Sequence, residues 1–128
     1  MEIIDSRVAD RHVSQADTVA DNASSTRVAV GRPVDATDDL LTGLRDECVG
    51  LSADGERVAF GLGAEVLGDP LRPWPGRPGR STRTAALSTR ASCCFTGSVH
   101  AGVPLTPGSR LAVRSGTGRL PGLTVTVR

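Results

Sequence analysis

The pattern of hydrophobic and polar residues divides this chain of 128 residues into four stretches. Residues 1–25 are polar with a thin apolar face, which predicts disorder or a weak helix. Residues 26–68 alternate apolar runs with turn residues and predict a small α+β segment. Residues 69–92 are rich in Pro and Arg and predict an extended linker, because proline disfavours helices and central strands. Residues 93–128 predict a poorly ordered stretch whose one ordered part is a β-hairpin.

Turn signals define the predicted strands of the α+β segment. Residues 27–30 form a short apolar run that ends at a Gly-Arg-Pro break. Asp54 and Gly55 stand between two further apolar runs, and Asp-Gly in this position indicates a hairpin because glycine tolerates positive φ. Residues 56–62 are then the returning strand of that hairpin.

A helix is predicted between the first strand and the hairpin. Asp35 or Thr37 can cap its N-terminus, and Asp38 and Asp39 in its first turn suit the helix dipole. The helix is expected to run from Asp38 to Arg45. Its apolar face consists of Leu40, Leu41, Leu44 and Cys48.

Two stretches near the C-terminus alternate apolar and polar residues with a period of two. They are residues 110–114 and 123–128, and we expect them to pair as strands. They are the ordered elements predicted after residue 69. The predicted fold class is therefore α+β, a small antiparallel strand-and-helix fragment followed by a largely disordered basic C-terminal half.

Charge is distributed very unevenly along the chain. All 14 acidic residues lie between Glu2 and Asp69, where six arginines reduce the net charge to −8. The other nine arginines lie in residues 70–128, which contain no acid and carry +9. Lysine is absent, which indicates a GC-rich gene, and the Asp-rich first half resembles proteins of halophilic archaea.

The tripeptide Ser-Thr-Arg occurs twice in the acid-free half, at residues 81–83 and 88–90. In a GC-rich gene, codons for Val-Asp-Ala give Ser-Thr-Arg when they are read in a shifted frame, and the same shift removes Asp codons. We therefore hypothesise that residues from about 70 onward are a frameshifted translation. The alternative is a basic, disordered tail of ordinary origin.

Two clusters that superficially suggest ligand sites have simpler explanations. The run Gly61-Leu62-Gly63 lacks the third glycine of a dinucleotide-binding fingerprint, since Val66 stands in that place, and predicts turn glycines. The adjacent Cys93 and Cys94, with His100 nearby, lack the spacing of a zinc site, because neighbouring cysteines cannot easily reach one tetrahedral ion. These are expected to be incidental thiols and a surface histidine.

Further candidate pairs also carry structural interpretations. Cys48 with His12 or His100 has no local support as a nucleophile and base, and Cys48 is expected to be buried on the helix face. The acidic pairs are interpreted as helix-end electrostatics and solubility on an exposed helix; they are Asp38 with Asp39, and Asp46 with Glu47. We therefore assign no catalytic, cofactor-binding or metal-binding residue.

The arginine-rich run around the single tryptophan offers an alternative surface for nucleic acid. Its arginines could neutralise phosphates while the tryptophan stacks on a base. A solvated basic linker is the interpretation that we favour. The residues of the alternative surface are Arg72, Trp74, Arg77, Arg80, Arg83 and Arg90.

The N-terminus has neither the basic start nor the apolar run of a signal peptide. No stretch approaches the roughly 18 apolar residues of a membrane span. We expect a cytoplasmic protein that does not enter a membrane. Its partner is unknown from the sequence, and nucleic acid is an alternative that we do not favour.

Residues 26–68 resemble the N-terminal region of chorismate-utilising enzymes, in particular isochorismate synthase of halophilic archaea. The similar features are the strand near Val28, the helix from Asp38, and the strand–turn–strand from Val49 to Ala64. The resemblance implies a parent enzyme that converts chorismate to isochorismate with Mg²⁺, in a part of the family that is not matched here. It implies a truncated or frameshifted remnant with no autonomous activity and no cofactor of its own.

Two other functions remain open from the sequence. One is a small nucleic-acid-binding protein that uses the arginine-rich C-terminal half. The other is an interaction module whose acidic and basic halves pair with each other or with a second chain.

Overall fold

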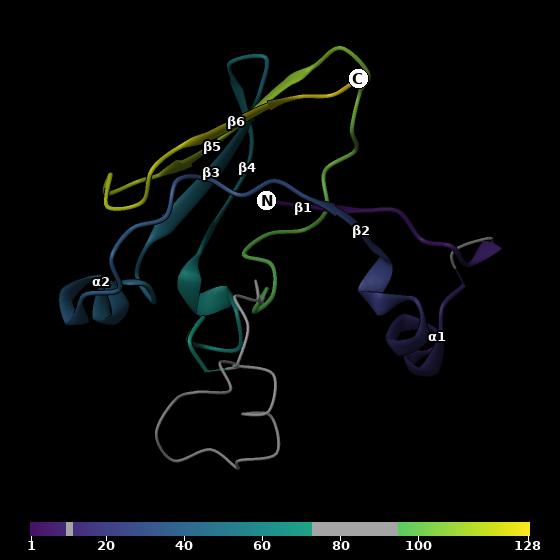
Figure 1. Ribbon diagram of the computed structural model, residues 1–128, viewed down its shortest axis with the longest axis horizontal. Helices are drawn as coiled ribbons and strands as arrows, with labels where there is room; N and C mark the ends of the chain where they lie inside the picture. Colours follow the sequence, from purple (N-terminus) through teal and green to yellow (C-terminus); the bar gives the residue numbers. More distant parts are fainter. Residues whose placement is uncertain (10–11, 73–94) are drawn as a thin grey trace. The chain divides into compact units, whose positions relative to one another are not determined.

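The computed structural model describes residues 1–9, 12–72 and 95–128 (Figure 1). The chain divides into two compact units, residues 1–32 and 33–128, and each is described by itself. The described residues form mostly strands, arranged in a two-stranded and a four-stranded antiparallel sheet, with few and short helices. The predicted α+β class with a largely disordered C-terminal half is therefore wrong. No helix in the described part of the chain is long and apolar enough to cross a membrane.

The N-terminal unit is built on a pair of short strands. β1 (Glu2–Ile4) pairs antiparallel with β2 (Ser25–Val28), and Ile3 lies opposite Arg27. Between the strands lie a short helix, α1 (Gln15–Ala20), and a single turn, η2 (Asn22–Ser24).

A capping box explains why a helix forms in this polar stretch. Ser14 is the N-cap of α1, and its Oγ accepts a hydrogen bond from the backbone N–H of Asp17. The Asp17 carboxylate accepts one in return from the backbone N–H of Ser14 at 2.9 Å. This reciprocal pair satisfies amides that the first turn of a helix leaves open.

The C-terminal unit is organised by one sheet with the strand order β4-β3-β5-β6, in which every neighbouring pair is antiparallel. β5 pairs with β3 and not with β4, which precedes it in the chain. β3 is therefore paired on both sides, with β4 on one and β5 on the other. The elements of this unit are α2 (Asp38–Gly43), β3 (Cys48–Ala53), β4 (Glu56–Leu62), η3 (Gly63–Glu65), β5 (Arg110–Ser115) and β6 (Leu123–Thr126).

The core of this sheet joins residues from both halves of the sequence. Leu51 on β3 is 6% exposed and Leu111 on β5 is 2% exposed, and Leu51 lies opposite Val113. The strands predicted at residues 110–114 and 123–128 do pair, as β5 and β6. The frameshift hypothesis predicts no packing between the chain after about residue 70 and the chain before it, and the pairing of β5 with β3 differs from that expectation.

The predicted Asp-Gly hairpin is present between β3 and β4. Asp54 and Gly55 have φ values of 50° and 94°, the left-handed pair that a tight hairpin turn requires. The turn also anchors the third strand, because the Asp54 carboxylate accepts a hydrogen bond from the backbone N–H of Arg110 at 2.8 Å. The backbone N–H of Asp54 donates in turn to the Arg110 carbonyl at 2.9 Å.

The predicted helix is present as α2 but ends earlier than expected. Thr37 is its N-cap, and the Thr37 hydroxyl accepts from the backbone N–H of Leu40 at 3.3 Å. The helix ends at Gly43, with Leu44 as its C-cap, and the Arg119 side chain fills the space where a Cβ of Gly43 would lie. Cys48 was predicted to lie buried on the apolar face of this helix, and this is wrong. It is the half-buried first residue of β3.

Two glycines after the hairpin are required by close backbone approaches. A Cβ at Gly61 would collide with the carbonyl of Val99, and a Cβ at Gly63 would collide with the carbonyl of Leu44. The Gly-Leu-Gly run therefore lets two other stretches lie against the end of β4, namely the chain around Val99 before β5 and the chain around Leu44 before β3.

We predict that Gly61→Ala lowers the free energy of unfolding by about 1–3 kcal/mol, because the new methyl group overpacks against Val99. Gly50→Ala is the matched control, since nothing lies within 4 Å of a Cβ there. Urea unfolding of both variants measures the difference. Equal losses in the two variants would contradict the close approach at Gly61.

Candidate functional site

A strained turn distinguishes the N-terminal unit. Asn22, Ala23 and Ser24 have φ values of 51°, 54° and 60°, so three consecutive residues that are not glycine are left-handed. This conformation costs roughly 1–2 kcal/mol per residue. Such strain persists only where the surroundings fix it, and it occurs most often at functional sites. The turn η2 is therefore the natural place to look for a site.

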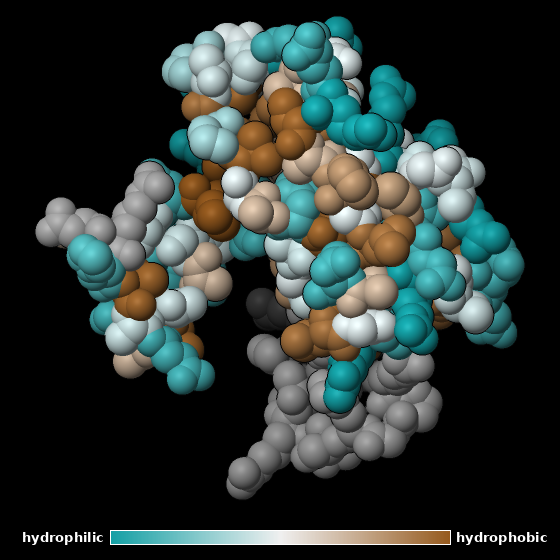
Figure 2. All heavy atoms as spheres, turned by 180° about the vertical axis from the view of Figure 1, so that it is seen from behind, coloured by the Kyte–Doolittle hydropathy of each residue, from teal (hydrophilic) through white to brown (hydrophobic). Residues whose placement is uncertain are grey.

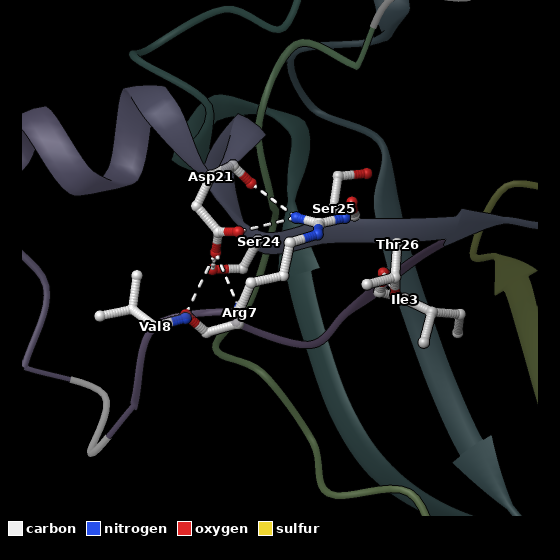
Figure 3. Close-up of polar contacts among 8 residues, drawn as sticks. Ile3, Arg7, Val8, Asp21, Ser24, Ser25 and Thr26 are labelled. Carbon is white, nitrogen blue, oxygen red and sulfur yellow. Dashed lines mark hydrogen bonds and ion pairs between the residues drawn. The ribbon is translucent and has the colours of Figure 1, made fainter.

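Asp21 holds this turn from its N-terminal side (Figure 3). The side chain is buried, with the residue 7% exposed, and its Oδ2 accepts from the hydroxyl of Ser24 at 2.9 Å and of Ser6 at 3.1 Å. The Asp21 carbonyl also accepts from the backbone N–H of Ser24 at 2.9 Å. Asp21 thus links the last residue of the left-handed turn, Ser24, to Ser6, which follows β1 in the chain.

Arg7 neutralises the buried carboxylate and adds a link to β2. Its Nη1 donates to Asp21 Oδ1 at 2.8 Å and to the Asp21 carbonyl at 2.9 Å, and its Nη2 donates to the Ser25 carbonyl at 2.8 Å. The Arg7 guanidinium lowers the pKa of Asp21 to about 2, against the opposing effect of burial and with help from Ser24 and Ser6. The carboxylate is therefore ionised at any physiological pH.

A small cavity lies beside the strained turn. It has a volume of about 210 Å³ and is lined by Ile4, Asp5, Ser6, Val13 and Ser24. The Ser24 carbonyl accepts from the backbone N–H of Asp5 at 2.8 Å, which fixes the wall between turn and strand. Three polar residues and two apolar residues therefore line the cavity, and the hydroxyls of Ser6 and Ser24 both donate to the Asp21 carboxylate beside it. The volume is below the 300 Å³ or so of a typical small-molecule site.

A second buried carboxylate lies in the C-terminal unit. Glu47 is 3% exposed and accepts from the Ser115 hydroxyl at 2.7 Å, from the backbone N–H of Thr117 at 3.2 Å and from the Thr117 hydroxyl. Burial alone would raise the pKa of Glu47, but these hydrogen bonds together outweigh it and lower the pKa. The residue joins the start of β3 to the turn after β5 and has no open side for a ligand.

Arg72 is the member of the alternative nucleic-acid surface that lies within the described residues. Arg72 donates through Nη1 to the Leu67 carbonyl at 3.1 Å. The other five lie outside the described residues, as do Cys93 and Cys94. They are Trp74, Arg77, Arg80, Arg83 and Arg90.

The remaining candidate ligands are not brought together. Within residues 1–9, 12–72 and 95–128, no group of three His, Cys, Asp or Glu residues could hold a metal ion. The ring Nδ1 of His100 lies 2.7 Å from the carbonyl of its neighbour Ala101.

Sequence reasoning missed both buried carboxylates. Asp46 and Glu47 were expected on an exposed helix, and for Glu47 this is wrong, because the helix ends at Gly43 and Glu47 faces β5. Asp21 gave only one usable signal, the following Asn22, since asparagine tolerates the left-handed region better than most residues.

No family model matches the chain. It is 35% identical over 114 residues to a 4-oxalocrotonate decarboxylase of Pseudomonas sp. (strain CF600), which is 89% of this chain and 42% of that relative. It is 44% identical over 72 residues to a 2-keto-4-pentenoate hydratase of Burkholderia vietnamiensis (strain G4 / LMG 22486), which is 56% of this chain and 26% of that relative.

Solved structures agree with the sequence matches. The 4-oxalocrotonate decarboxylase of Pseudomonas putida G7, complexed with magnesium and adipate, superposes with a TM-score of 0.74 at 32% identity. The match covers 99% of this chain and 47% of that one. A second structure of that enzyme, with calcium and acetate, gives a TM-score of 0.70. This chain thus spans less than half the length of these relatives.

These comparisons correct the predicted relationship. They point to 4-oxalocrotonate decarboxylases and 2-keto-4-pentenoate hydratases, not to chorismate-utilising enzymes or a haloarchaeal isochorismate synthase remnant. They support neither the nucleic-acid-binding alternative nor the interaction module. The expectation of no cofactor is also corrected, because both solved relatives hold a divalent metal ion.

We predict that the N-terminal unit loses stability as the pH falls from about 4 to 2. Asp21 has a lowered pKa of about 2, so its contribution is complete above the unfolded value of 3.8 and is lost as the folded group becomes protonated. Asp21→Asn should be less stable at pH 7 and should lack this acid dependence. Asp35→Asn is the exposed control, and urea unfolding between pH 2 and 7 measures all three proteins. An unchanged acid dependence in Asp21→Asn would contradict the assignment.

We predict that Glu47→Gln lowers the free energy of unfolding by about 1–3 kcal/mol. The glutamine side chain would place its NH₂ group, a donor, opposite the hydroxyl and N–H donors of Ser115 and Thr117, which would then lack an acceptor. Asp46→Asn is the matched control because it changes an exposed neighbour in the same way, and its effect should stay within about 0.5 kcal/mol. Similar losses in the two variants, measured by urea unfolding, would show that the Glu47 hydrogen bonds do not matter.

Proposed function

We propose that this chain is part of an enzyme that acts on an unsaturated 2-oxo acid, with decarboxylation as its reaction. The observation that supports the proposal is the similarity to 4-oxalocrotonate decarboxylases. It is found in a sequence match over 89% of the chain and in a structural match over 99% of it. Because the chain spans 42% of the decarboxylase it matches, the activity is proposed for the whole enzyme and not for these residues alone. A cytoplasmic location remains a prediction.

The substrate class follows from the chemistry that the relatives' names share. Both 4-oxalocrotonate and 2-keto-4-pentenoate carry a ketone next to a carboxylate, together with a carbon–carbon double bond. Adjacent ketone and carboxylate oxygens are hard ligands, of the kind that Mg²⁺ and Ca²⁺ prefer. A divalent metal in the whole enzyme is therefore part of the proposal.

The described residues do not themselves fit a metal site. They contain no group of three His, Cys, Asp or Glu side chains placed for one ion. Asp21 and Glu47 are unsuitable as ligands, because the oxygens of both are already used by hydrogen bonds from protein donors. We therefore assign no step of the reaction to a metal held by these residues.

The chain's own contribution is a positioned polar wall. Arg7 and Asp21 hold the left-handed turn, and that turn presents Ser24 at the cavity together with Asp5 and Ser6. Rigid positioning of this kind lowers the entropy lost when a substrate is oriented.

Hydration is a second candidate reaction. The identity to the hydratases reaches 44%, higher than to the decarboxylases, although over 72 residues only. The two reactions share the substrate class and are separated by the product.

The test replaces the matched segment of the Pseudomonas putida G7 decarboxylase with residues 1–128. We expect this chimera, with Mg²⁺, to release CO₂ from 4-oxalocrotonate, and both that substrate and 2-keto-4-pentenoate are assayed. Asp21→Ala in the chimera should lower turnover by about 100-fold, because the wall is displaced. Asp35→Ala is the control and should leave turnover unchanged. A folded chimera that turns over neither substrate would contradict the proposal.

A further inference from the structure

The four-stranded sheet has one buried and one open face. Residues opposite each other in the register lie on the same face, so Phe60, Gly50 and Arg114 form one row across β4, β3 and β5. The buried Leu51 and Leu111 belong to the other face, the core side. The row with Phe60 therefore lies on the open face.

Large apolar side chains lie uncovered along β4. Phe60 is 63% exposed, and Val58 and Leu62 are each 44% exposed. Figure 2 shows that hydrophobic residues lie open at the surface between hydrophilic ones. A single exposed apolar side chain is ordinary, but a row of three along one strand is characteristic of a surface that is covered in the assembled protein.

The same face is basic. The Arg57 guanidinium lies 5.5 Å from the centre of the Phe60 ring. Arg110 and Arg114 are exposed and lie four residues apart on β5, on the same face. Among the described residues, none of these three arginines forms a salt bridge. The surface is thus apolar along β4 and carries exposed arginines along β5, and the neighbouring Asp54 carboxylate accepts from the backbone N–H of Arg110.

The strand order leaves β4 at the edge of the sheet. A β-bulge interrupts its pairing with β3 near Val58, where the register shifts between Leu51 and Ser52. Bulges and charged residues are common devices that keep an edge strand from pairing with other chains. We therefore expect another segment to pack on the open face of the sheet and not to pair with the edge of β4 as an added strand.

We infer that this open face is the docking surface for the portion of the full-length enzyme that has no counterpart in this chain. The inference rests on the proposed function, and it specifies how the remaining polypeptide is held. That portion is more than half of the solved relative, since this chain matches 47% of it. By charge complementarity, the segment that covers the face presents apolar side chains to Phe60 and acidic side chains to Arg57 and Arg114.

The experiment compares thermal unfolding of the free chain, residues 1–128, with that of the decarboxylase chimera. Phe60→Ser should change the Tm of the free chain by less than about 1 °C, because the ring is exposed, and should lower that of the chimera by about 5 °C or more. Arg114→Glu should behave in the same way through charge. Leu105→Ser is the control, an exposed apolar residue outside the strands, and should have equal effects in both proteins.

Each outcome decides the inference. Small and equal shifts for Phe60→Ser in both proteins would overturn it. Dimerisation of the free chain in sedimentation experiments, abolished by Phe60→Ser, would also overturn it, because the occupant would then be a second copy. If Phe60→Ser prevents the chimera from folding, Arg114→Glu carries the comparison. Unfolding does not depend on turnover, so an inactive chimera that still shows the selective Tm loss would sink the proposed activity and leave the docking surface standing.

Discussion

The pairing of β3 with β5 is the contact on which the C-terminal unit depends. It joins residue 49 to residue 115 and residue 53 to residue 111, so a long stretch of chain has to be closed into a loop before the core can form. The entropic cost of closing a loop grows only slowly with loop length, so this long loop costs little more free energy than a short one. The pairing buries Leu111 on the core face of the sheet. It also completes the backbone hydrogen bonding of β3 on both of its edges.

Other features of the unit secure this pairing from its two ends. At one end the Asp54 carboxylate accepts from the amide that begins β5, and at the other end Glu47 accepts from Ser115 and Thr117 where β5 ends. Both carboxylates come from the residues that flank β3. The acidic first half and the acid-free second half of the sequence are therefore complementary at these points, although the contacts are hydrogen bonds to neutral groups and not ion pairs.

Local signals predicted the elements better than their arrangement. The Asp54–Gly55 turn, the strand over residues 56–62 and the strand at residue 110 are all present, because turn chemistry and period-two alternation act over a few residues. The neighbour of β3 could not be predicted, since nothing local to β5 records which strand it joins. The C-terminal half was predicted to be basic and largely disordered outside its two strands, yet Arg110 and Arg114 occupy the open side of an alternating strand that pairs with β3.

The site was harder to predict than the fold, and for a physical reason. Asp21 and Arg7 are 14 residues apart and meet only because β1 and β2 pair, so neither residue carries a recognisable motif. The left-handed turn directly precedes β2, and Ser24, its last residue, lines the cavity. A carboxylate that is fully occupied in holding backbone cannot also bind a metal. Under the proposed function, Asp21 therefore acts by fixing the turn that carries Ser24 and not as a ligand of its own.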